Sequence, residues 1–424
     1  MNVYDSDRMT DLVNNNYSLV KTPEAADAIL LNTCHIREKA AEKVYSEIGK
    51  YSDLKNSNKN LKIVVAGCVA QAEGKAMLHR QPLIDAIIGP QMYHKLPDIL
   101  LNKLNDKKIF LDFEEEKKFK KIGAIRKKKA QISSFITIQE GCDKFCSFCV
   151  VPFTRGAEFS RNLEDIVQEA NTLSDIGCRE VILLGQNVNA YHGVNKNNIQ
   201  ISLAKLVMEL EKIEKIDRIS YTTSHPNDMT EELIELHATS KKLNPYLHLP
   251  VQSGSDVILK NMNRKYTAKD YLKIIDKIRK RVPDIAISSD FIVGFPGETK
   301  KDFNATLRLI EQVNFAQSYS FKYSKRIGTR ASNIDCFITE QEKNERLQIL
   351  QKILNNQKKQ FNMSFLDKEV DVFFKGRAKK NNQFRGTTKW MQTAIFECDD
   401  ERFGNKVRLK INNAFDNCLM GELV

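Results

Sequence analysis

The sequence predicts an α/β protein in three parts: an N-terminal doubly wound α/β domain, a partial barrel of six βα units, and a small all-β barrel. Three patterns lead to this prediction. Short apolar segments alternate with helical ones over about the first 105 residues, strand–helix units repeat six times further on, and short alternating strands without helical periodicity end the chain. We expect domain boundaries at 1–105, 130–360 and 361–424, with a charged linker at 106–129.

The bulk composition is that of a globular chain. Of the 424 residues, 42% are hydrophobic and 28% charged, and no run of eighteen apolar residues occurs. Residues 1–7 lack the basic and apolar regions of a signal peptide, so we expect a cytoplasmic protein. A net charge of +12 favours an anionic partner, although a generally Lys-rich composition explains the charge equally well. Nine cysteines in a reducing compartment argue against a disulfide framework.

The first two parts have the patterns of parallel sheets. In the N-terminal part, strands are predicted at 28–31, 62–66 and 83–88, with a helix at 37–51. In the second part, strands are predicted at 135–139, 181–184, 218–222, 246–249, 285–293 and 317–323, with helices that include 163–174, 271–281 and 301–311. Successive βα units form a parallel sheet that curls into a partial barrel, whose site lies at the carboxyl ends of the strands.

The third part alternates apolar and polar residues over short segments. Strands are predicted at 369–374, 392–397, 406–411 and 418–423. Between the first two of them, basic residues occur without an intervening acid, together with Phe384 and Trp390. These basic residues are Lys375, Arg377, Lys379, Lys380, Arg385 and Lys389. The segment is either a solvated loop or a nucleic-acid contact in which cations meet phosphates and aromatic rings stack on bases.

The strongest chemical signal is a group of three cysteines directly after the first barrel strand. Cys142, Cys146 and Cys149 have the spacing C-x3-C-x2-C. Three thiolates on one loop can bind three irons of a [4Fe–4S] cluster and leave the fourth iron without a protein ligand. A structural zinc site would normally be closed by a fourth ligand, and no further Cys or His lies nearby in this segment.

Other polar residues stand where barrel strands end. Gly185 and Gln186 follow the second strand, Gln252 and Ser253 follow the fourth, and Asp290 and Glu298 surround the end of the fifth. They fit a cofactor site at the carboxyl ends of the strands. Each is also explained by an ordinary βα turn or a helix cap.

Cys34 and Cys68 form a second cysteine pair, each just after a predicted strand of the N-terminal part. Both would emerge at the carboxyl edge of one parallel sheet, where such folds bind ligands. Two buried structural thiols are the alternative. The remaining cysteines match no ligand spacing, and we expect them to be core or incidental.

The three-cysteine motif at the end of the first strand of a βα barrel resembles that of the radical S-adenosylmethionine (SAM) superfamily. Along nearly its whole length the chain is also similar to the bacterial methylthiotransferase family, with its N-terminal domain, radical core and C-terminal TRAM barrel in that order. The segments 32–40, 89–91, 185–190 and 262–264 are similar to those of the MiaB-type tRNA enzymes.

The resemblance implies two [4Fe–4S] clusters. Cys142, Cys146 and Cys149 would hold the radical SAM cluster, and Cys34 and Cys68 with a third cysteine an auxiliary cluster that supplies or carries sulfur. One SAM would methylate the sulfur, and a second would generate the radical that activates C2 of N6-isopentenyladenosine at position 37 of tRNA. The TRAM barrel would bind the RNA. A reductant such as flavodoxin or ferredoxin, a sulfur donor and a monomeric enzyme are implied as well.

One departure from the family concerns the third auxiliary cysteine. It stands two residues before the Met-Asn-Val-Tyr-Asp-Ser block, which here is residues 1–6, so we expect the natural chain to begin upstream of Met1. If it does not, a noncatalytic iron–sulfur RNA-binding protein becomes the alternative. A methylthiotransferase with another target is a second alternative. A SAM methyltransferase without radical chemistry would not need the three-cysteine motif.

Overall fold

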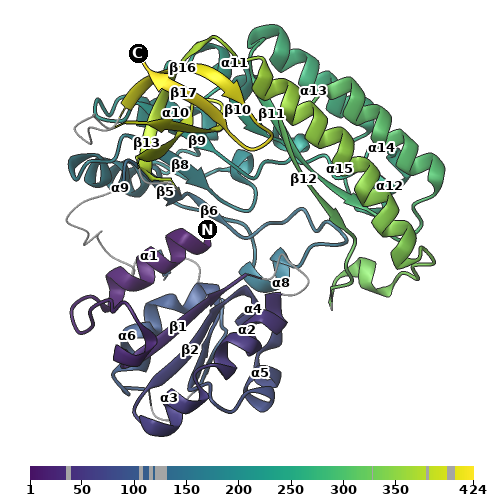
Figure 1. Ribbon diagram of the computed structural model, residues 1–424. Coiled ribbons are helices and arrows are strands. Elements are labelled where there is room, and N and C mark those ends of the chain that lie inside the picture. The colour runs from purple at the N-terminus through teal and green to yellow at the C-terminus, as the bar shows by residue number, and fades with distance from the viewer. Residues whose placement is uncertain are drawn as a thin grey trace. The chain divides into compact units, whose positions relative to one another are not determined.

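The computed structural model describes residues 1–34, 40–104, 108–113, 118–119, 131–326, 328–378, 382–398 and 406–424 (Figure 1). The chain forms two compact units, which are described separately. The N-terminal unit comprises Met1–Lys128, Gln139–Phe145 and Cys149–Arg161. The C-terminal unit comprises Lys129–Ile138, Cys146–Phe148 and Asn162–Val424.

The N-terminal unit is built on a four-stranded parallel sheet. Its strands lie in the order β1 (Ala28–Thr33), β2 (Lys62–Gly67), β3 (Ala86–Ile88) and β4 (Ile109–Phe110). The helices are α1 (Asn2–Val13), α2 (Ala40–Gly49), α3 (Ser52–Ser57), α4 (Cys68–Glu73), α5 (Lys75–Arg80) and α6 (Leu96–Leu100). The three strands predicted here are confirmed, and the helix predicted at 37–51 is described from Ala40.

Apolar side chains are buried on both faces of this sheet. Val64 and Ile88 pack with α1 and α6 on one face, whereas Val65 and Ile87 pack with α2, α4 and α5 on the other. A parallel sheet whose faces are both covered has near-continuous apolar strands, as β2 shows. The prediction of a doubly wound domain is therefore confirmed.

The predicted linker is wrong at its start. Ile109 and Phe110 form β4 and pair with Ile87 and Ile88, so this part of 106–129 belongs to the sheet. Two residues are too few for a periodic pattern to reveal a strand. Lys118, which lies within the predicted linker, is fully buried. Most of the remaining linker lies outside the described residues.

The C-terminal unit contains the six predicted parallel strands in chain order. β5 (Ser133–Thr137), β8 (Glu180–Leu184) and β9 (Arg218–Tyr221) form one sheet, and β10 (Tyr246–His248), β11 (Ala286–Val293) and β12 (Gln317–Lys322) form another. A single parallel bridge between Ile219 and Leu243 joins the two sheets. The connecting and covering helices are α9 (Leu163–Asp175), α10 (Leu203–Glu211), α11 (Glu231–Thr239), α12 (Asp256–Asn261), α13 (Ala268–Arg281), α14 (Lys300–Val313) and α15 (Glu340–Met363).

Local sequence explains where the outer helices begin. Thr267 and Asp270 form a reciprocal capping box at the start of α13, and Thr299 and Asp302 form another at the start of α14.

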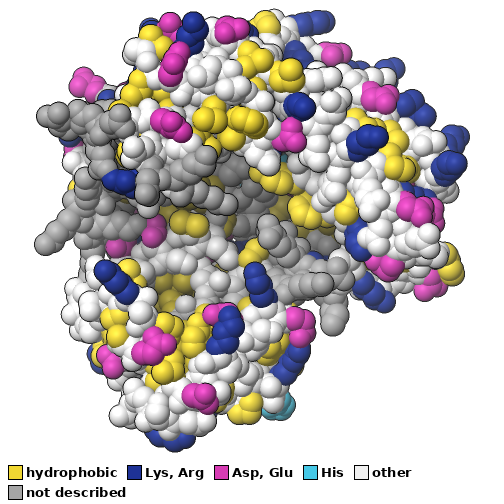
Figure 2. Space-filling view, viewed as in Figure 1, with side chains coloured by type: hydrophobic (Ala, Val, Ile, Leu, Met, Phe, Trp, Pro, Cys, Tyr) yellow, Lys and Arg dark blue, Asp and Glu magenta, His cyan; other side chains and the backbone are white. Residues whose placement is uncertain are grey.

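Lys and Arg side chains on the face shown in Figure 2 are interspersed with Asp and Glu over these helices. Lys273, for example, pairs with Asp270. The net positive charge of the chain is therefore not concentrated in one patch on this face.

The C-terminal segment closes into a five-stranded barrel, as predicted. Its strands are β13 (Glu369–Arg377), β14 (Gln383–Thr388), β15 (Thr393–Glu397), β16 (Lys406–Ala414) and β17 (Leu419–Leu423), closed in the order β13-β14-β15-β17-β16. β14 was not predicted, because its basic residues favoured a loop. Phe384, on β14, packs in the barrel core with Phe396 and Leu409.

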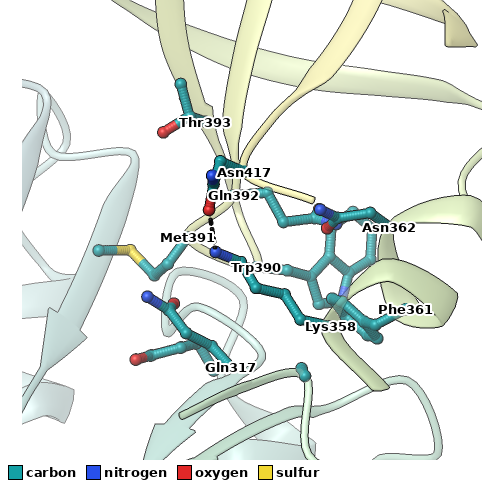
Figure 3. Close-up of a pocket in the computed structure, with 11 residues that line it drawn as sticks. Gln317, Lys358, Phe361, Asn362, Trp390, Met391, Gln392, Thr393 and Asn417 are labelled. Atoms are coloured by element: carbon teal, nitrogen blue, oxygen red, sulfur yellow. Dashed lines mark hydrogen bonds between the residues drawn. The ribbon is translucent and has the colours of Figure 1, made fainter. Parts of the chain in front are cut away.

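Within the C-terminal unit, the small barrel packs against residues at the amino ends of the parallel strands. The Arg218 guanidinium, on β9, donates to the carbonyl oxygens of Thr387 (2.9 Å) and Asp371 (2.8 Å). A cavity of about 70 Å³ lies in this region, and Figure 3 shows Met391 and Trp390 pointing in different directions beside it. Met391 reaches Ser220 on β9, and Trp390 donates to the Asp284 carbonyl.

None of the helices in the described ranges is long and apolar enough to cross a membrane.

Candidate active site

The three cysteines of the motif lie in the segment between β6 (Gln139–Glu140) and α8 (Val151–Arg155). Cys142, Cys146 and Cys149 are all half-buried cysteines. Gly141 precedes them with φ of +74°, and a Cβ at this position would lie 1.9 Å from the Ala157 carbonyl oxygen. Only glycine therefore fits this turn into the motif without strain.

The donor set fits an iron–sulfur cluster by type and spacing. Three half-buried thiols occur within eight residues, and the amide of Val151 lies 3.5 Å from Sγ of Cys149. Amides directed at sulfur are a usual feature of such sites. Within the described ranges, no group of three or more His, Cys, Asp or Glu side chains lies close enough together to hold a metal ion. The chain thus brings the three thiols onto one short segment but does not close them into a ligand set.

Arg264 holds the middle cysteine of the motif. Its buried guanidinium donates to Sγ of Cys146 (3.4 Å), the Pro250 carbonyl (2.5 Å) and the Tyr266 hydroxyl (2.7 Å). Burial alone would lower the pKa of Arg264, but Tyr266 and Cys146 outweigh this effect and raise it above its ordinary value. A permanent positive charge therefore lies against Cys146.

Cys34 and Cys68 emerge side by side from the N-terminal sheet. Thr33 pairs with Gly67 at the ends of β1 and β2, and each cysteine is the next residue in its strand's sequence. Gly67 has φ of +99°, and its Cβ would lie 2.3 Å from the Thr33 carbonyl oxygen. Both thiols are half-buried rather than core residues. This arrangement agrees with the prediction that they share the carboxyl edge of the sheet.

Four of the six predicted cofactor residues lie at or near the carboxyl ends of strands. Gly185 and Gln186 follow β8, Gln252 has φ of +74° and bonds through its backbone to β11, and Asp290 is on β11 with a partly exposed side chain. These four assignments remain predictions.

The other two residues are engaged in internal hydrogen bonds. Ser253 is fully buried, and its Oγ lies 3.3 Å from that of Thr306. Glu298 is also buried, where it accepts from the Gly294 amide (2.6 Å) and pairs with Arg346 (2.6 Å). These contacts explain both residue types without a cofactor.

Asp290 belongs to a polar group on one face of β10, β11 and β12. His248 lies 3.0 Å from Ser288 Oγ through Nδ1 and 3.6 Å from Asp290 Oδ2 through Nε2, and the Tyr319 ring packs edge-on against the imidazole. Burial and the charge of Asp290 raise the pKa of Tyr319. The phenol is therefore a neutral hydrogen-bond donor at neutral pH. Tyr319 and Phe321 remain substantially exposed, which suits a planar ligand.

The predicted RNA contacts have different surroundings. Arg385 is exposed on β14, Arg377 lies over the Phe384 ring at 5.7 Å, and Lys375 is 3.6 Å from the buried Glu180 carboxylate. Lys379 and Lys380 lie outside the described residues. Stacking of a base on Phe384 is excluded because this ring is only 3% exposed.

Several functional candidates were missed by sequence reasoning. Arg264 stands in the compared segment 262–264, but only its contact with Cys146 indicates a role. The N-terminal unit also contains four buried charged residues that form ion pairs with one another: Asp5, Lys118, Glu140 and Arg155. Because they are far apart in the chain, no sequence pattern indicates that they meet. By contrast, Cys178 is fully buried, in line with the expectation that the remaining cysteines are core or incidental.

Comparison with known proteins agrees with this arrangement. Residues 136–310 match the model of the radical SAM superfamily, and residues 1–89 match a model described as uncharacterized protein family UPF0004. A tRNA-2-methylthio-N(6)-dimethylallyladenosine synthase of Ruegeria sp. (strain TM1040) is 50% identical over all of this chain and 96% of its own length. The enzyme of the same name from Jannaschia sp. (strain CCS1) is 50% identical over all of this chain and 92% of its own.

Among solved structures, the chain is similar in fold to the radical SAM methyltransferase TsrM from Kitasatospora setae. The complex of TsrM with tryptophan and a SAM analogue gives a TM-score of 0.56 at 13% identity and covers 75% of this chain and 69% of that one. The structure with cobalamin and a [4Fe–4S] cluster gives 0.52, also at 13% identity, over 72% and 65%. At this identity the likeness concerns the fold alone.

Proposed function

Because the chain belongs to the family of tRNA-2-methylthio-N(6)-dimethylallyladenosine synthases, we propose that it methylthiolates C2 of N6-isopentenyladenosine at position 37 of tRNA. The product is 2-methylthio-N6-isopentenyladenosine. SAM serves both as methyl donor and as radical source, as expected of a radical SAM enzyme.

The observation that supports this proposal is the presence of two separate cysteine sets in one chain. Cys142, Cys146 and Cys149 follow the first barrel strand, whereas Cys34 and Cys68 follow neighbouring strands of the N-terminal sheet. A single set would suffice for radical formation. Insertion of sulfur needs a second site that can carry it.

The residues of the chain have distinct tasks in this proposal. A [4Fe–4S] cluster, when bound at the three-cysteine motif, supplies the electron that splits SAM into methionine and a 5′-deoxyadenosyl radical. Arg264 fixes the position of Cys146, and Gly185, Gln186, Gln252 and Asp290 cradle SAM at the strand ends. Cys34 and Cys68 hold the auxiliary cluster. His248, Asp290 and the exposed ring of Tyr319 provide hydrogen bonds and a flat surface beside the reacting centre.

The partners follow from the reaction. The anticodon loop of tRNA supplies the adenosine, and the C-terminal barrel with Lys375, Arg377, Lys379, Lys380 and Arg385 binds the RNA backbone. A small reductant such as flavodoxin or ferredoxin supplies electrons, and a separate donor replaces the sulfur. We place the enzyme in the cytoplasm as a monomer, with an N-terminal domain that extends through β4 and further domains at 130–360 and 361–424.

The two cysteine sets can be separated by mutation. After anaerobic reconstitution, Cys146→Ala should abolish formation of 5′-deoxyadenosine and of the methylthio product while leaving tRNA affinity within about twofold. Cys34→Ala with Cys68→Ala should keep 5′-deoxyadenosine formation but lose the product, and iron content should fall from about eight to about four per chain. Chromatography of nucleosides and of deoxyadenosine measures both outcomes.

Cys398→Ala is the matched control, because Cys398 is a half-buried cysteine that directly follows β15 in the terminal barrel. It should behave as the unmodified protein does. Surviving SAM cleavage in Cys146→Ala would overturn the assignment of the radical site. Surviving methylthiolation in the double variant would overturn the role of Cys34 and Cys68.

A further inference from the structure

Four charged side chains are buried together in the N-terminal unit. Asp5 on α1 pairs with Arg155 at the end of α8 (2.8 Å), and Arg155 also pairs with Glu140 (3.2 Å). Lys118 pairs with Glu140 (2.5 Å) and lies 3.6 Å from Asp5. No side chain of this quartet is more than 3% exposed. Two acids face two bases, so the quartet is neutral as a whole.

The quartet joins segments that carry both cysteine sets. Glu140 stands two residues before Cys142, and Arg155 stands six residues after Cys149. Asp5 is on α1, where the Asn2 carbonyl accepts a bond from the Asn32 side chain of β1 (2.9 Å), two residues before Cys34. The contact between α1 and β1 thus links Asp5 to the sheet edge with Cys34 and Cys68.

Two further contacts tie α8 to the same sheet edge. α8 packs against α4, the helix that begins at Cys68. The carbonyl of Arg155 accepts a hydrogen bond from the buried side chain of Gln91 (2.9 Å). The Lys118 ammonium also lies over the Tyr93 ring, 5.0 Å from the ring centroid. The end of α8 is therefore held by its side chain, its backbone and its helix packing.

Displacing a buried ion pair leaves a charge buried without its partner, which is strongly destabilising. The four charges come from separate parts of the sequence. Each acid meets its cations only when α1, Lys118, β6 and α8 take one relative position. The network therefore suits a role in holding two reactive sites at a fixed separation.

We propose that Asp5, Lys118, Glu140 and Arg155 form a positioning device that fixes Cys142 and Cys149 relative to Cys34 and Cys68. This proposal rests on the proposed function, in which a radical formed at one cysteine set must be used with sulfur carried at the other. When the device is broken, SAM is still cleaved, but the radical is more often quenched before sulfur is inserted. The quartet acts through the segments it holds and does not touch the substrate.

Arg155→Met tests the device because Met keeps the apolar volume and removes the charge. Hydrogen exchange of the full chain, before and after cluster reconstitution, is measured in peptides that cover 139–145 and 149–161. We expect at least about tenfold faster exchange in these peptides than in the unmodified protein. The ratio of 5′-deoxyadenosine to methylthio product should rise by about tenfold.

Lys55→Met is the matched control in the same unit. Lys55 pairs with Asp85 (2.7 Å) before the amino end of β3, at the opposite end of the sheet from the cysteines. This variant also removes a cation from a partly buried pair, but it should change neither the exchange of 139–161 nor the product ratio.

Unchanged exchange of these peptides in Arg155→Met, or an unchanged ratio with normal SAM cleavage, would overturn the proposal. If Arg155→Met does not fold, Arg155→Lys decides: a ratio of 5′-deoxyadenosine to product above that of the unmodified protein supports the device, and the unmodified ratio overturns it. If the unmodified protein forms no methylthio product, the proposed function fails, and the exchange measurement still decides whether the quartet holds the two segments.

Discussion

Asp5 in the N-terminal unit and Glu298 in the C-terminal unit are both buried carboxylates, yet their pKa values shift in opposite directions. Burial alone raises the pKa of each. For Asp5, the nearby Arg155 and Lys118 outweigh burial and lower the pKa. For Glu298, the Gly294 amide and Arg346 oppose burial without overcoming it, and Asp302 adds a further upward shift.

The difference lies in how many cations serve each acid. Asp5 faces two cations within a neutral group of four charges. Within the described ranges, Glu298 forms an ion pair with Arg346 alone, and Arg346 also pairs with Glu342. A buried acid therefore stays readily ionised where cations match acids in number, and ionises less readily where one cation is shared. The first arrangement suits permanent positioning, and the second leaves Glu298 dependent on a single partner.

The largest expected effect on stability follows from removing that single partner. Arg346→Met leaves Glu298 buried without a cation, which should cost about 3–5 kcal/mol of unfolding free energy. Asp5→Asn should cost less, about 1.5–3 kcal/mol, because Glu140 still balances part of the charge of Lys118 and Arg155. Native-state hydrogen exchange of β11 and β2 measures the two units separately.

The double variant Arg346→Met with Glu298→Gln provides the control. It removes the uncompensated charge, so at least about 1 kcal/mol should be recovered relative to Arg346→Met alone. If Asp5→Asn proves more costly than Arg346→Met, then the number of cations does not explain the difference between the two sites.

Stability should depend on pH with opposite sign at the two acids. The pKa of Asp5 in the folded state lies below its ordinary 3.8, so its stabilisation is full above that value and is lost as pH falls through the folded-state pKa. The pKa of Glu298 lies above its ordinary 4.5, so stability contributed by this site falls as pH rises from 4.5 toward the folded-state pKa.

Replacing each carboxylate with its isosteric amide isolates the pH-dependent contribution of that acid to stability. Between pH 4 and 7, the stability of β11 in the unmodified protein relative to Glu298→Gln should increase on acidification. The stability of β2 relative to Asp5→Asn should stay nearly constant until the pH falls below 3.8. Parallel pH profiles for both pairs would contradict the opposite shifts.

The quartet also illustrates what the sequence alone could predict. Residues at short spacing, such as Cys142, Cys146 and Cys149, or residues that end neighbouring strands, such as Cys34 and Cys68, leave a local pattern. Asp5 and Arg155 are 150 residues apart, and nothing near either one indicates the other. Their pairing is a product of tertiary structure, which side-chain periodicity does not encode.

The same limit explains the errors in the fold. The six barrel strands recur as parts of successive strand–helix units and were found within a few residues of their bounds. β4 has two residues, and β14 alternates exposed Arg385 with buried Phe384 in a basic segment whose charge suggested a loop. A barrel that buries only one face tolerates cations on the other, so composition was misleading there.

Replacing a surface cation of the terminal barrel should have the smallest effect on stability, and it tests RNA binding. Arg385 is exposed, and no ion pair to it lies within the described ranges. If it contacts a phosphate, Arg385→Ala should reduce the slope of log affinity for tRNA against log salt by about 0.9. Unfolding free energy should change by no more than about 0.5 kcal/mol. Filter binding at several salt concentrations measures the slope.

Arg408 is the matched control on the same barrel, because its guanidinium is paired with Asp371 (3.2 Å) and Glu369 (3.8 Å). A cation already neutralised by two carboxylates releases fewer counterions from RNA, so Arg408→Ala should change the slope less than Arg385→Ala does. An equal effect of the two variants would mean that the barrel acts through its total charge. An unchanged slope in Arg385→Ala would remove this strand from the RNA interface.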